Sequence, residues 1–346
     1  MKITVLVPAH NEEETIGSTL ASLQGQTRAP DRIVVVADNC SDATAEIARS
    51  HGVSVFTTVG NVHKKAGALN QILARVLPDA SPDDAVLVMD ADSVLDPTWI
   101  AEAVSRLEAG YSACGGTFTG RAGGGFIGML QRNEYARYQR DVARKNGKTL
   151  VLTGTATLFR VAALAEVVEA RRSGRLPGEP AVYDVRVLTE DNELTLAFLH
   201  LGHRIIAPAE CHLTTEVMTS WGDLHRQRLR WKRGALENLI DYRLTRHTLP
   251  YWGRQALSAV GLLVTCSYLL SVAVTLALVG SVRIHPVWMF VTLIFMAEQA
   301  VTVRARGWKM VLLALVLVVE MPYDLFLQAT HARALFHAAR RAERNW

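Results

Sequence analysis

Long apolar stretches in the last third of the chain constrain its fold more than any other feature. Three of them are almost wholly or mostly apolar: 256–280, 287–303 and 310–330. A helix needs about 20 apolar residues to cross the hydrocarbon core of a bilayer, and the first stretch meets that length easily. The second is of borderline length and contains Glu298, whereas Glu320 and Asp324 interrupt the third. We therefore expect about three C-terminal transmembrane helices, preceded by an interfacial helix or linker over 235–255.

The charges around these stretches predict a topology but leave one point open. The basic loop 304–309 favours the cytosolic side, together with the N-terminal domain, because short cytosolic loops are enriched in Lys and Arg. Three complete spans would then place the basic tail 331–346 outside, against the same tendency. Either the third segment re-enters the bilayer or the tail is an exception. In both cases we expect a multi-pass protein of the cell (inner) membrane.

The overall charge and the cysteines argue against several classes of protein. A formal net charge of +4 over 346 residues is too small for a dedicated nucleic-acid binder, so we expect no nucleic-acid partner. The basic residues gather near the apolar stretches, where they suit an anionic membrane surface. The four cysteines show no metal-binding spacing, and we expect them to be reduced and unpaired in a cytosolic setting. The N-terminus is typical of a buried strand and not of a signal peptide.

The first 234 residues alternate between short apolar runs and segments with helical spacing. The runs predict strands at 3–7, 32–37, 53–57 and 85–89, and the intervening segments predict helices at 15–23, 43–51 and 66–76. This alternation indicates βαβ units and a mostly parallel sheet, in which ligands bind at the carboxyl ends of the strands. Polar clusters follow three of these strands: 9–13, 38–42 and 90–92. The sequence therefore predicts one site at that edge of the sheet.

Asp90 and Asp92 are separated by one alanine at the end of the run 85–89. Side chains alternate in an extended chain, so both carboxylates point to the same side. Two such carboxylates suit a hard divalent cation that also holds a diphosphate. The same motif alone would fit a haloacid-type phosphatase or a solvated loop.

Two further segments carry groups suited to a nucleotide. After the second strand, Asp38 is the better candidate for a ligand of a base or ribose, because Asp42 is better placed to cap the next helix. Lys64 and Lys65 stand beside a glycine at a helix start, where a phosphate is favoured by the helix dipole and the lysine charge together. Exposed lysines are often merely solvated, so this reading depends on the other motifs.

Two later segments suggest catalysis and acceptor binding. The acidic cluster 189–193 opens a predicted helix over 189–201, and Asp191 could deprotonate a hydroxyl group, although acidic residues are ordinary in a first helical turn. In the basic segment 227–233, Arg230 could bind a diphosphate and Trp231 could offer an apolar face to a sugar ring. A basic, Trp-containing helix before a membrane segment would equally sit in the headgroup layer.

Six segments, taken together and in this order, resemble glycosyltransferase family 2, which includes cellulose, hyaluronan and poly-N-acetylglucosamine synthases. They are Val7-Pro8-Ala9-His10-Asn11-Glu12-Glu13, Ala37-Asp38-Asn39, Lys65-Ala66-Gly67-Ala68-Leu69-Asn70, Asp90-Ala91-Asp92, Thr189-Glu190-Asp191 and Gln227-x-x-Arg230-Trp231. The resemblance covers residues 3 to about 234. It implies a Rossmann-like GT-A domain of the α/β class over 1–234 and inverting transfer of a sugar from a nucleotide-diphosphate donor, by default a UDP-sugar.

The resemblance also implies roles for single residues. The nucleotide sugar would be bound by Ala9, Glu12, Asp38, Lys65, Asp90 and Asp92. A divalent cation, Mg2+ or Mn2+, would be held by Asp92 and Asp90. Asp191 would be the catalytic base of the displacement. The acceptor and the diphosphate would be bound by Glu190, Gln227, Arg230 and Trp231. The acceptor would be a glycan or a lipid-linked molecule, and homo-oligomerisation stays open.

The chain departs from the family pattern at a few positions. Ala37 stands where the family often has an aspartate, Asn39 where a glycine is common and Cys40 where a serine is common. These departures leave the base of the donor nucleotide less well defined than nucleotide binding itself. No transmembrane segment is expected before the domain, unlike in cellulose synthase. The membrane part is also short for an enzyme that secretes a long polymer, whereas the Gln-x-x-Arg-Trp motif argues for chain elongation.

Three alternative functions account for parts of this pattern. A polyprenyl-phosphate glycosyltransferase would make a lipid-linked sugar, but such enzymes commonly lack the Gln-x-x-Arg-Trp motif. A non-catalytic nucleotide-sugar-binding membrane protein would be expected to lose Asp92 or Asp191, and both are present. A phosphatase or nucleotidyltransferase would leave 189–191 and 227–231 unexplained.

Overall fold

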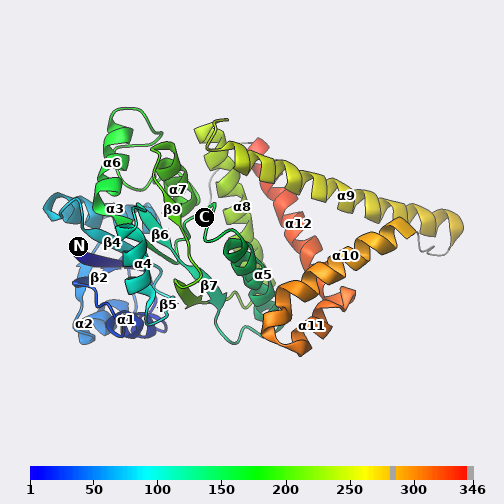
Figure 1. Cartoon of the computed structure of the whole chain (residues 1–346), viewed down its shortest axis with the longest axis horizontal. Coiled ribbons are helices and arrows are strands. Elements are labelled where there is room, and N and C mark those ends of the chain that lie inside the picture. The colour runs from blue at the N-terminus through cyan, green and yellow to red at the C-terminus, as the bar shows by residue number, and fades with distance from the viewer. Residues whose placement is uncertain (281–285, 341–346) are drawn as a thin grey trace. The chain divides into compact units, whose positions relative to one another are not determined.

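The computed structural model describes residues 1–280 and 286–340, and the chain divides into two compact units (Figure 1). The first unit comprises Met1–Gly124 and Tyr138–Met218. The second comprises Gly125–Arg137 and the chain from Thr219 onward. Helix α5, Gly125–Arg144, therefore contributes residues to both units.

The first unit is built on a seven-stranded sheet with the order β3-β2-β1-β4-β8-β6-β9. Its strands are β1 Ile3–Ala9, β2 Arg32–Ala37, β3 Ser54–Thr57, β4 Ala85–Met89, β6 Ala113–Gly115, β8 Ala156–Arg160 and β9 Ile205–Ile206. The four strands from β3 to β4 are parallel, which confirms the predicted mostly parallel α/β sheet. All residues of β4 are buried, as its continuous apolar run requires for a strand covered on both faces.

The direction of the sheet reverses at β8. This strand runs antiparallel to β4 and to β6, whereas β6 and β9 are parallel. Ala156 at the start of β8 pairs with Met89 at the end of β4. The loop before β8 therefore arrives at the carboxyl end of β4. A second, three-stranded sheet has the order β5-β10-β7, with β5 Val94–Leu95, β7 Thr117–Gly120 and β10 His212–Thr215.

The helices of the first unit follow the predicted alternation. They are α1 Ile16–Gln24, α2 Thr44–Ser50, α3 Lys64–Val76, the 3-10 turn η1 Leu77–Asp79, α4 Trp99–Glu108, α6 Val161–Arg172 and α7 Glu190–His200. Helix α3 packs on β1 and β2, and its buried face includes Leu69 and Leu73. The N-cap residue of α2 is Ala43, one position after the predicted Asp42, and Asp42 accepts a hydrogen bond from the backbone N–H of Thr44 at 3.1 Å.

The second unit is helical. Besides the first part of α5 it contains α8 Trp221–Tyr242, α9 Leu249–Val279, α10 Pro286–Val303, the 3-10 turn η2 Arg304–Arg306, α11 Trp308–Ala314 and α12 Leu317–Ala339. Helix α12 packs along α8. The stretch 310–330, predicted as one segment, is shared between α11 and α12, because Val316 adopts an extended conformation between them. Residues 331–339 of the predicted tail continue α12, and 341–346 lie outside the described residues.

In the described part of the chain, one helix is long and apolar enough to cross a membrane. It spans Leu249–Leu278, with a mean hydropathy of 2.1 over its most apolar window and none of that window buried. Its 30 residues extend about 45 Å at 1.5 Å per residue. The helix Met289–Val303 is apolar but shorter. Transmembrane spans at 287–303 and 310–330 therefore stay predictions.

Candidate active site

Lys65 lies at the centre of the polar cluster in the first unit. Its ammonium nitrogen lies 2.5 Å from Oδ1 of Asp90, which directly follows β4, and 3.4 Å from Oε1 of Glu190, which begins α7. It also donates a hydrogen bond to the carbonyl oxygen of Gly154 at 3.3 Å. Burial disfavours its charged form, but Asp90 and Glu190 outweigh burial and raise the pKa of Lys65. One cation therefore joins three segments that are far apart in the sequence.

Asp191 lies in the first turn of α7, on the other side of Gly154. Its Oδ2 accepts a hydrogen bond from the backbone N–H of Gly154 at 3.0 Å, and its Oδ1 accepts one from the N–H of Asn192 at 2.7 Å. Burial, followed by the charge of Glu190, raises the pKa of Asp191 to about 6, although Lys65 acts in the opposite direction. A carboxylate with this pKa is ionised at neutral pH and is still a better base than an ordinary aspartate.

Gly154 lies between the two charged side chains, so a side chain at this position would displace the ammonium group of Lys65. A Cβ atom added there would lie 2.8 Å from Nζ of Lys65 and 3.5 Å from Oδ2 of Asp191. Lys65, Gly154, Glu190 and Asp191 also line a cavity of about 10 Å3, which is room for about one water-sized group.

Asp92 lies among other carboxylates. Burial, then the charges of Asp90 and Glu12, raise its pKa to about 7. Burial also raises the pKa of Glu12, and among the neighbouring carboxylates Glu216 contributes most to this rise. Asp92 accepts only a long hydrogen bond from the hydroxyl group of Thr215, at 3.4 Å, besides one from its neighbour Ser93. In the chain as described, no lysine or arginine pairs with Asp92.

This surplus of negative charge fits a divalent cation. Among residues 1–280 and 286–340, no group of three or more His, Cys, Asp or Glu side chains is placed to hold a metal ion. A pair of carboxylates is nevertheless what Mg2+ or Mn2+ uses when phosphate oxygens and water supply the other ligands. Asp90 and Asp92 therefore fit a metal that is shared with a diphosphate.

Asp38 lies at the carboxyl end of the neighbouring strand and is buried. Its Oδ1 accepts hydrogen bonds from the hydroxyl group of Thr58 and from Nδ2 of Asn61, both at 2.8 Å. Its other carboxylate oxygen accepts no hydrogen bond from the residues that the structure covers. Ala9, at the end of β1, accepts a hydrogen bond from the backbone N–H of Asp38 through its carbonyl oxygen, at 2.9 Å. Gly67 is required here, since a Cβ would lie 2.1 Å from Asn61 Oδ1.

Gln227, Arg230 and Trp231 all lie on α8 in the second unit and are half-buried. The eight other predicted site residues belong to the first unit, where the structure brings Lys65, Asp90, Glu190 and Asp191 together.

Several residues of the site are not among those predicted from the sequence. Gly154 and Thr215 lie in segments without a charged or periodic signal, and only their contacts identify them. Asn61 follows a third strand, so its position at a strand end was a signal that could have found it. Glu216 directly follows β10 and offers the same signal.

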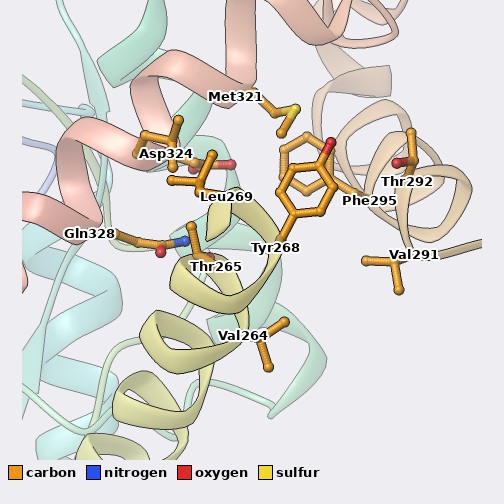
Figure 2. A pocket seen from close by; sticks show the side chains of 11 residues that line it. Val264, Thr265, Tyr268, Leu269, Val291, Thr292, Phe295, Met321, Asp324 and Gln328 are labelled. Carbon is orange, nitrogen blue, oxygen red and sulfur yellow. The ribbon is translucent and has the colours of Figure 1, made fainter. Parts of the chain in front are cut away.

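A larger cavity of about 160 Å3 lies within the second unit, between α9, α10 and α12. Figure 2 shows Tyr268, Phe295 and Met321 on its walls, with Asp324 and Gln328 beside them on α12. None of the predicted site residues lines it.

Comparison with known proteins shows what the chain is similar to. Residues 4–168 match the family model described as glycosyl transferase family 2. A poly-beta-1,6-N-acetyl-D-glucosamine synthase of Staphylococcus aureus is 27% identical over 248 residues, which are 69% of this chain and 55% of that protein. The corresponding synthase of Staphylococcus epidermidis is 26% identical over the same length. The chain therefore spans about half the length of these curated relatives.

A solved structure shares the fold over nearly the whole chain. It is the mannosyltransferase PcManGT from Pyrobaculum calidifontis, in complex with GDP-Man and Mn2+. The two superpose with a TM-score of 0.66 at 19% identity, over 99% of this chain and 88% of that one. The family match, together with the similar synthases, leads to one conclusion: residues 4–168 of the chain form a domain of glycosyl transferase family 2.

Proposed function

We propose that the chain is a membrane-bound inverting glycosyltransferase that transfers a sugar from a nucleotide-diphosphate donor to a glycan or lipid-linked acceptor. The observation that carries this proposal is that Asp191 and Lys65 both contact Gly154, one through its N–H group and the other through its carbonyl oxygen. Since Lys65 also contacts Asp90, the proposed base Asp191 lies near the carboxyl end of β4. A base and a diphosphate site must lie this close if a hydroxyl group is to attack the sugar between them.

In the proposed reaction, Asp191 accepts the proton of the acceptor hydroxyl group. The acceptor oxygen forms a bond to the anomeric carbon while the bond from that carbon to the diphosphate oxygen breaks. The bonding electrons leave with the nucleoside diphosphate, and the anomeric configuration inverts. A divalent cation bound by Asp90 and Asp92 would neutralise the charge on the leaving diphosphate. Lys65 holds Asp90 in place and adds positive charge at the same point.

The nucleotide would bind along the strand ends beside Ala9 and Asp38. The buried, firmly held Asp38 has one carboxylate oxygen left to accept a hydrogen bond from a base or ribose. Glu12 would line the same pocket, as the family resemblance implies. We propose a UDP-sugar as donor, with N-acetylglucosamine as the first sugar to test, because the similar synthases are named for a polymer of this sugar.

The membrane attachment is proposed from the surface of α9. Leu257, Leu263, Leu270 and Leu278 are exposed by 65 to 81%, so apolar side chains cover the helix without a protein partner in the structure as described. A soluble protein would have to hide such a surface, whereas a lipid bilayer covers it. A multi-pass arrangement with the active site on the cytosolic face stays part of this proposal.

The first test is a nucleotide-release assay on detergent-purified protein. UDP-N-acetylglucosamine, other UDP-sugars and GDP-mannose are each offered with Mn2+ or Mg2+, with a glycan or a polyprenyl phosphate as acceptor. We expect metal-dependent release from one donor, abolished by Asp191→Asn without loss of UDP binding. The exposed Asp83→Asn is the matched control. Normal turnover by Asp191→Asn would refute its role as the base. Transfer only to the polyprenyl phosphate would favour synthesis of a lipid-linked sugar.

A further inference from the structure

Arg228, which lies inside the Gln-x-x-Arg-Trp segment, contacts two of the residues proposed to bind acceptor and diphosphate. Its guanidinium carbon lies over the indole ring of Trp231, 4.4 Å from the ring centre. Its Nη1 donates a short hydrogen bond to Oε1 of Gln227. Arg228 is 2% exposed, so it is not itself available to a substrate at the surface. Its position allows it to orient the two side chains that flank it.

The guanidinium is fixed from its other side by Glu134 on α5. Nη2 donates to Oε2 of Glu134 at 2.8 Å, and Nε donates to Oε1 at 3.2 Å. This two-point contact uses the planar fork of arginine and restricts both its position and its rotation. Burial opposes ionisation of Glu134, but Arg228 outweighs burial and lowers the pKa of the carboxyl group. The pair is therefore charged at neutral pH.

A third helix completes the arrangement. The hydroxyl group of Tyr323 on α12 donates a hydrogen bond to Oε2 of Glu134 at 2.7 Å. The ring of Tyr323 is buried and stacks on Phe326, with Trp221 of α8 also in contact. Since the ring makes its own packing contacts, the hydroxyl group can be removed without removing the side chain from the core.

We propose that Arg228, held by Glu134 and Tyr323, is a positioning residue that fixes the orientation of Gln227 and Trp231 for acceptor binding. The apolar C-terminal part of the chain would then serve as more than an anchor, because α12 supplies the hydroxyl group at the end of this network. The inference rests on the proposed function in one respect, namely that Gln227 and Trp231 bind the acceptor or the diphosphate.

The kinetic test compares three conservative variants: Tyr323→Phe, Glu134→Gln and Arg228→Lys. We expect Tyr323→Phe to raise the acceptor KM by about fivefold to tenfold with a smaller change in kcat, as the loss of one hydrogen bond to a charged group allows. Arg228→Lys should have a larger effect, because an ammonium cannot reproduce the fork. The Tyr323→Phe and Glu134→Gln effects should not add, since both act through Arg228.

The matched control is Glu237→Gln, which breaks a comparable buried pair, Arg233–Glu237 at 2.6 Å, further along the same helix. We expect its acceptor KM to equal that of the wild type. An equal rise in KM in this control would mean general loosening of α8 and would overturn the proposal. Unchanged KM values in both Tyr323→Phe and Arg228→Lys would overturn it as well.

A spectroscopic test separates this inference from the proposed function. Subtracting the near-UV circular dichroism of Trp231→Phe from that of the wild type isolates the signal of Trp231. We expect this difference to shrink when it is measured in the Arg228→Lys background, because the indole loses its fixed neighbour. An undiminished signal would overturn the proposal even if no donor were found. Failure of the wild type to release nucleotide, with a diminished signal, would refute only the proposed function.

Discussion

Replacing Lys65 with methionine should move the acidic limb of the pH–activity profile to higher pH. Asp191 has a pKa of about 6, and the positive charge of Lys65 is one of the influences that hold it down. Because Asp191 must be ionised to act as the base, the activity is at its maximum above this pKa. It is lost as the pH falls through the pKa. Without Lys65 the pKa of Asp191 rises, so the loss of activity should begin at a higher pH.

The magnitude follows from the geometry around Gly154. Lys65 Nζ lies 3.3 Å from the carbonyl oxygen of this glycine, and Asp191 Oδ2 lies 3.0 Å from its amide nitrogen. For charges roughly 6 Å apart at an effective dielectric constant of about 20, Coulomb's law gives about 2.8 kcal/mol, or about 2 pH units. Solvent reduces this value because both side chains are partly exposed, so we expect about 1 pH unit.

The assay is kcat for nucleotide release with saturating donor and acceptor, measured across the acidic range for the wild type and Lys65→Met. Lys64→Met is the matched control, because Lys64 is an exposed lysine in the same turn of α3. Its profile should coincide with that of the wild type. A Lys65→Met profile with an unshifted acidic limb, or one shifted to lower pH, would refute the electrostatic role assigned to Lys65.

Three further changes test other parts of the structure. Gly154→Ala places a Cβ 2.8 Å from Nζ of Lys65, so kcat should fall by about tenfold with little change in the melting temperature; unchanged kcat would contradict the close packing. Arg171→Met leaves Glu193 buried without its cation, 2.6 Å away in the structure, and should lower the free energy of unfolding by about 3–5 kcal/mol in urea denaturation; a loss below about 1 kcal/mol would argue against that pair. Chelation with EDTA should stop nucleotide release and added Mn2+ should restore it in the wild type but not in Asp92→Ala; rescue of that variant would remove Asp92 from the metal site.

The sheet and most of the site could be predicted from the sequence because their signals are local. A continuous apolar run identifies β4, and the position of Asp90 after it places the carboxylate at a ligand-binding edge. Gly154 could not be predicted in this way, since its role arises from a reversal of strand direction that brings 151–155 to the end of β4. Nothing in its neighbouring residues marks that contact.

The helical unit shows a different limit. The apolar composition of 256–280 indicates a long helix, and α9 is one. The stretch 310–330 has a similar overall composition, but it contains polar residues that have particular partners. Gln299 of α10, for example, donates a hydrogen bond to Asp324 at 3.4 Å. Hydropathy alone does not report such pairings.

The antiparallel course of β8 has a consequence for engineering. The strands that would bind the donor nucleotide, β1 to β4, form one parallel block. The loop that contacts the proposed catalytic base, Asp191, instead leads into β8, which runs in the opposite direction. The loop 145–155 could therefore be exchanged with that of a related enzyme while the parallel block keeps its register. The surroundings of the proposed catalytic base and the donor preference would then be separable targets for redesign, provided that the glycine facing Lys65 is retained.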